Sequence, residues 1–82
     1  MPENRHSTEE LIQELVKHQQ AKVLKVAREI VPDATTEDIR NPQDFPDLVA
    51  DALFNYEDGI LAGYLSMQTA LRKRFGSENT DL

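Results

Sequence analysis

The sequence predicts an all-α protein, an antiparallel hairpin of two long helices. Apolar residues recur at helical spacing through two long stretches, and a stretch rich in proline and aspartate separates them. The chain has 82 residues and no cysteine, which allows one hydrophobic core without disulfides. We divide it into a flexible N-terminus (residues 1–6), a single helical domain (residues 7–76) and a flexible tail (residues 77–82).

The first predicted helix covers residues 8–31. Ser7 and Glu10 have the spacing of a capping box, in which two side chains accept hydrogen bonds from free backbone N–H groups at the helix start. Apolar positions then repeat at heptad spacing, with Gln19 filling one position of the seam. These positions are Ile12, Val16, Val23, Val26 and Ile30. Pro32 ends the helix, because the residue before a proline disfavours helical geometry.

Residues 32–45 are predicted to form the loop between the helices, with one helical turn over residues 36–39. The second helix covers residues 46–75. Asp44 is typical of its N-cap and Pro46 of its first turn, and Gly76 is a suitable C-cap.

Two helices alone leave apolar surface uncovered. The main apolar stripe of the second helix consists of Val49, Ala52, Leu53, Tyr56, Ile60, Gly63, Tyr64, Met67 and Leu71. A second stripe, formed by Phe54, Leu61 and Leu65, would face water in an isolated hairpin. We therefore expect a homodimer, a four-helix bundle whose interface includes this second stripe. The alternative is a three-helix monomer that breaks near Gly59 and covers both stripes itself.

A row of small residues also follows the second helix. It consists of Ala52, Gly59, Gly63, Ser66 and Ala70. A glycine inside a helix costs about 1 kcal/mol relative to alanine, so close approach of a neighbouring helix is a reason to keep one. We assign Gly59 and Gly63 to the dimer interface, the alternative being a hinge at Gly59 with Gly63 incidental.

Charge is unevenly distributed along the chain. The formal net charge is −6, and residues 32–58 hold one arginine against eight carboxylates, a net charge of −7. Such a segment attracts a basic partner, and we assign the docking of a basic protein to Asp33, Glu37 and Asp38. The alternative interpretation is a solvated surface combined with the preference of helix starts for negative charge.

Few residues indicate chemistry. Glu14 and His18 are one helical turn apart and are weak candidates for metal binding. Glu57 lies inside the apolar arc, where a carboxylate must be paired or neutral, and antiparallel packing places it near Lys17, Lys22, Lys25 or His18. We interpret it as a salt-bridge partner. A metal- or ligand-binding bundle or enzyme that uses Glu57, Glu14 and His18 is the alternative.

The sequence favours a small non-enzymatic interaction module of the adaptor or regulator kind, with no catalytic residue and no cofactor. Arg72, Lys73 and Arg74 offer a nucleic-acid alternative, which the net negative charge opposes. No apolar stretch reaches the ~18 residues that span a bilayer, and no apolar run follows the N-terminus as in a signal peptide. We therefore expect a cytoplasmic protein without a membrane partner.

Overall fold

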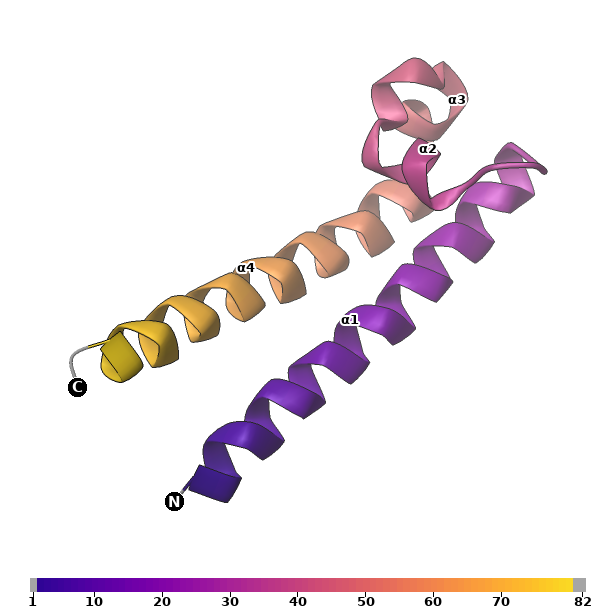
Figure 1. Cartoon of the computed structure of the whole chain (residues 1–82). Helices are drawn as coiled ribbons and strands as arrows, with labels where there is room; N and C mark the ends of the chain where they lie inside the picture. Colours follow the sequence, from indigo (N-terminus) through magenta and orange to yellow (C-terminus); the bar gives the residue numbers. More distant parts are fainter. Residues whose placement is uncertain (1, 81–82) are drawn as a thin grey trace.

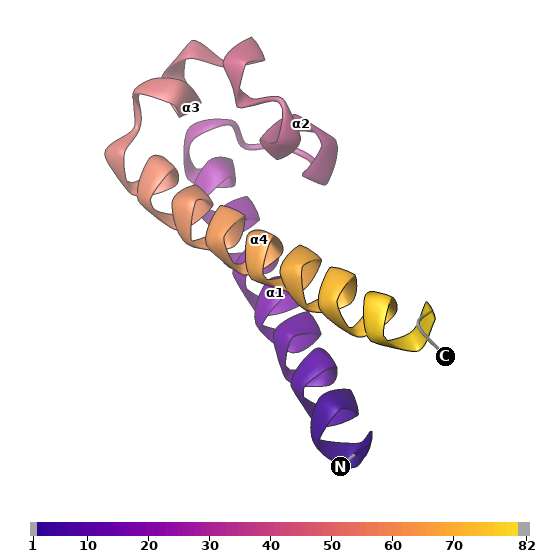
Figure 2. The ribbon, with the colours of Figure 1, turned by 90° about the vertical axis from the view of Figure 1, so that its left-hand side faces the viewer.

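The structure, a computed structural model, describes residues 2–80 and the side chains of residues 7–75. Two long helices, α1 (Pro2–Ile30) and α4 (Ala52–Thr80), pack against each other in antiparallel orientation (Figure 1). The described residues form helices and no strand, which confirms the all-α prediction and the pairing of two long helices. The molecule is elongated, 49 × 19 × 19 Å, and the long helices diverge towards the termini (Figure 2).

Three short helices connect the long ones and cover one end of the hairpin. They are α2 (Thr36–Arg40), the 3₁₀ helix η1 (Pro42–Asp44) and α3 (Pro46–Ala50). Thr35 caps α2, because its hydroxyl accepts a hydrogen bond from the Asp38 backbone N–H at 3.2 Å and its own N–H donates to the Asp38 carboxylate at 2.9 Å. The helical turn expected inside the loop is therefore present, and the rest of the loop is also largely helical.

Both long helices extend beyond their predicted limits. Helix α1 begins at Pro2 rather than at residue 8, so Ser7 lies inside the helix and is not its N-cap. A proline is tolerated in the first helical turn, and no residue between it and Ser7 stops a helix, so the local capping preference is overridden. Helix α4 continues through Gly76 to Thr80. Of the predicted tail, residues 81 and 82 lie outside the described residues.

The predicted second helix is interrupted, but at Asp51 and not at Gly59. Asp51 has extended backbone angles (φ −83°, ψ 120°), and its carboxylate accepts a hydrogen bond from the Phe54 N–H at 2.8 Å. That bond satisfies one of the free donors at the start of α4 and makes Asp51 its N-cap. Helix α4 is continuous through Gly59, so the alternative of a break there is wrong.

The buried cluster corrects the predicted interface. Phe54 is fully buried and Leu61 nearly so within the single chain, whereas Leu65 remains 39% exposed. The connection explains the difference, because α2 and α3 add Ile39 and Leu48 to the same cluster. A hairpin of two helices alone would lack this cover from the connection. Because the connection buries Phe54 and Leu61, this stripe is not available to a second chain.

Candidate functional site

An uncovered apolar surface lies along α4. Its large members are Leu53, Tyr56, Ile60 and Met67, and the small residues Ala52, Gly59, Gly63, Ser66 and Ala70 lie beside them. At 100° per residue these nine positions fall within an arc of about 140°, turned away from the buried Phe54 and Leu61. We call this surface the outer face of α4.

The outer face is exposed and uncharged. Tyr56 is 65% exposed, Met67 51% and Leu53 50%, while Ile60 is half-buried. None of the nine residues carries a charge, and α4 contains no charged residue at all from Gly59 to Leu71. A surface helix normally presents charged or polar side chains on its outer side, so this face has the composition of a covered one.

The two interior glycines lie on this outer face, and among the described residues no side chain or other element packs against them. A Cβ atom added at Gly59 or at Gly63 would have no atom within 4 Å apart from the adjacent backbone of its own helix. Their cost in helix propensity is therefore not offset by close packing within one chain.

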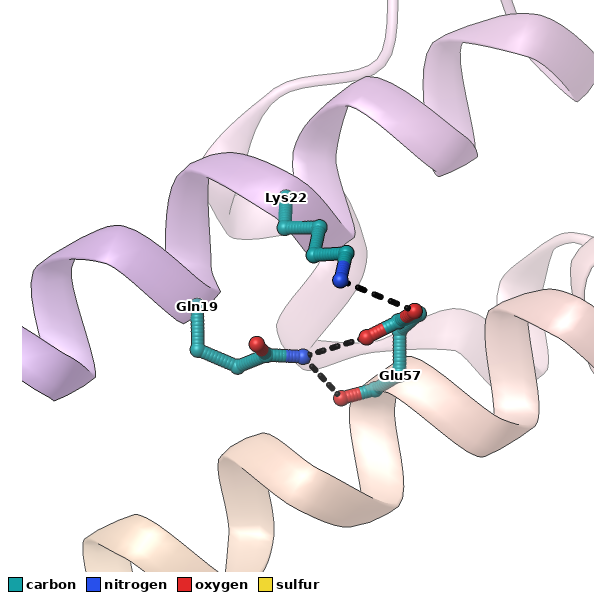
Figure 3. A network of polar contacts seen from close by, with 3 residues as sticks. All are labelled: Gln19, Lys22 and Glu57. Atoms are coloured by element: carbon teal, nitrogen blue, oxygen red, sulfur yellow. Dashed lines mark hydrogen bonds and ion pairs between the residues drawn. The ribbon is translucent and has the colours of Figure 1, made fainter.

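A buried polar cluster joins the second half of α1 to the first two turns of α4. The Gln19 amide nitrogen donates to the Glu57 carboxylate at 2.8 Å and to the Glu57 backbone carbonyl at 2.9 Å (Figure 3). Lys22 Nζ lies 3.5 Å from the other carboxylate oxygen. Gln19 and Glu57 are both nearly inaccessible to solvent, so each needs the other as a partner. Their contacts fix the register of the hairpin.

This cluster accounts for Glu57 without invoking a metal. Glu14 and His18 lie on the exposed surface of α1, whereas the Glu57 carboxylate points at Gln19 and Lys22 between the helices. The structure does not bring the three candidate ligands together. Among the described residues there is no group of three or more His, Cys, Asp or Glu side chains that could hold a metal ion.

A cleft of about 400 Å³ opens between α4 and the connection. It is lined by Gln20, Thr36, Ile39, Arg40, Pro42, Asp58, Leu61, Ala62 and Leu65. We call it the α2–α4 cleft. Partial burial removes water from the Asp58 carboxylate and raises its pKa above the ordinary value of 3.8. This cleft could not be predicted from the sequence, because its walls come from three separate segments.

The other predicted residues lie at two ends of the molecule. Asp33 and Glu37 are exposed at the connection end, but Asp38 is engaged in the cap of α2. Arg72, Lys73 and Arg74 are exposed near the far end of α4. Over the part of the chain that the structure describes, no helix is long and apolar enough to cross a membrane.

Comparison of the chain with protein-family models, with curated proteins and with solved structures finds no match in any of the three. Its function is therefore inferred from its own surfaces and contacts.

Proposed function

We propose that this chain is a non-enzymatic interaction module that works as a homodimer through the outer face of α4, with its acidic end, residues 32–58, turned towards a basic partner. The observation that carries the proposal is the uncharged and exposed outer face. An uncharged apolar face offers nothing to a charged partner, but it suits a two-fold contact in which the same residues meet each other.

The dimensions of the chain also support self-association. It exposes 5984 Å², whereas a compact monomer of 9.3 kDa is expected to expose about 5000 Å². The surplus of about 1000 Å² per chain is close to the ~800 Å² that each partner buries in an interface of standard size. The radius of gyration, 15.7 Å, likewise exceeds the value of about 12 Å for a compact chain of this length.

Light scattering at micromolar concentration should give a mass of twice 9.3 kDa for the wild-type chain. Replacing Tyr56 and Met67 together by lysine should give the single-chain mass, because two unpaired charges would then be buried in each half of the interface. Ala21→Lys with Thr69→Lys adds the same charge at exposed positions off the face and should leave the dimer intact. A wild-type mass of 9.3 kDa would refute the proposal.

Gly63→Leu should stabilise the isolated chain but weaken the dimer. In the isolated chain the position is open, so leucine should raise the free energy of unfolding by about 0.5–1 kcal/mol through helix propensity. In the dimer the added side chain should overpack a helix contact, which costs about 1–3 kcal/mol and raises the dissociation constant about tenfold. Thermal melts at low concentration and sedimentation at several concentrations separate the two effects. Thr69→Leu, off the face, is the control, and an unchanged dissociation constant for Gly63→Leu would place Gly63 outside the contact.

A further inference from the structure

We infer that the α2–α4 cleft binds a peptide segment of the basic partner, with a large apolar side chain on the floor of the cleft and a lysine or arginine at Asp58. The inference rests on the proposed function, in which residues 32–58 face a basic partner, and it assigns that partner a binding site. It does not depend on dimer formation, because all the lining residues belong to one chain.

The floor of the cleft suits an apolar side chain. Ile39 and Leu61 are nearly buried and form its base, and Leu65 remains exposed at its wall. The four lining residues of α4 are spaced i, i+3, i+4 and i+7, so they form one stripe along the helix. They are Asp58, Leu61, Ala62 and Leu65. The stripe runs about 10 Å along the helix axis, a length that suits a short segment of peptide chain.

Asp58 supplies the charge that selects a cation. Among the described residues it has no hydrogen bond or ion pair from its side chain, although it is partly buried. A cationic side chain placed there would compensate for the lost hydration of the carboxylate. The net charge of −7 over residues 32–58 raises the local concentration of cations around the same opening.

Arg40 distinguishes a peptide from a simple organic cation. Its guanidinium also lines the cleft, and no ion pair within the described part of the chain engages it. Because Arg40 is exposed at the cleft, its guanidinium is free to donate to the backbone carbonyl groups of a bound peptide, whereas an alkylammonium ion offers it no acceptor. A peptide with one apolar and one cationic side chain therefore matches the apolar floor, the Asp58 carboxylate and the Arg40 guanidinium of the cleft.

The cleft stays open in the proposed dimer. At 100° per residue, its stripe on α4 lies about half a turn away from Tyr56 and Gly63 on the outer face. A second chain on the outer face therefore leaves Asp58 and Leu65 accessible.

Fluorescence anisotropy with two labelled peptides tests the inference. The first peptide, of about twelve residues, carries two leucines one helical turn apart and a lysine beside them, with alanine and glutamine elsewhere; the second has glutamine in place of the lysine. We expect the lysine peptide to bind the wild-type chain about tenfold more tightly than the glutamine peptide. Asp58→Asn should abolish this preference, whereas Asp47→Asn, which removes the same charge at an exposed site outside the cleft, should retain it.

Two further variants test the other walls. Leu65→Ser should weaken both peptides alike, and Arg40→Gln should weaken both by severalfold. Equal binding of the two peptides, equal effects of Asp58→Asn and Asp47→Asn, or no binding at millimolar peptide would overturn the inference. Binding of hexylammonium that depends on Asp58 but not on Arg40 would overturn the assignment to a peptide. The Tyr56→Lys, Met67→Lys chain should still bind the lysine peptide. The test therefore distinguishes a wrong dimer proposal from a wrong peptide-binding inference.

Discussion

Phe54→Ala should lower the free energy of unfolding by about 3–5 kcal/mol, because it removes a fully buried aromatic ring and leaves a cavity. The ring belongs to the cluster that Ile39 and Leu48 complete from the connection. A chain of 82 residues is expected to have a total stability of about 4–12 kcal/mol, so the substitution should remove a quarter or more of it.

Urea denaturation followed by circular dichroism measures this loss. Val49→Ala is the matched control, because Val49 is an apolar residue of the same region that is 49% exposed. Its substitution should cost less than about 1 kcal/mol. Similar losses for the two variants would show that the connection does not cover Phe54 in solution.

Gln19→Leu should destabilise the chain by about 1–3 kcal/mol, because it leaves a buried carboxylate oxygen of Glu57 without its hydrogen-bond donor. Replacing both residues by leucine should recover most of the loss, since no buried polar group then remains unpaired. Lys22→Gln should cost less than about 1 kcal/mol, because the lysine side chain is 54% exposed.

A double-mutant cycle over Gln19 and Glu57 measures the coupling directly. The expected result is a non-additive cycle, with the double variant more stable than Gln19→Leu alone. Additive losses would mean that the two side chains act independently and do not set the register of the helices.

The sequence predicted the two long helices and their pairing because both depend on local periodicity. It did not predict which apolar stripe of the second helix faces inwards. A helical wheel shows that Phe54 and Tyr56 are both apolar, but it does not show which of them other segments cover. The cover comes from Ala34, Ile39 and Leu48, which are too few and too irregularly spaced to give a periodic signal.

The polar cluster illustrates the same limit. Gln19 interrupts the heptad seam and has no partner nearby in the sequence, because its partner Glu57 lies 38 residues away. The pairing of Glu57 with a lysine was within reach of sequence reasoning, since antiparallel packing places lysines opposite it. The cleft at Asp58 was not, because three segments must fold before it exists.

The divergence of α1 and α4 has a consequence for how the molecule assembles. The most deeply buried residues gather near the connection, where the chain returns on itself over short distances, so closing this end first costs the least loop entropy. Helix pairing can then proceed outwards, and the bond between Gln19 and Glu57 admits only one alignment before the outer turns meet. Opening runs in the reverse direction, so the diverging ends should separate and reclose many times for each complete unfolding event.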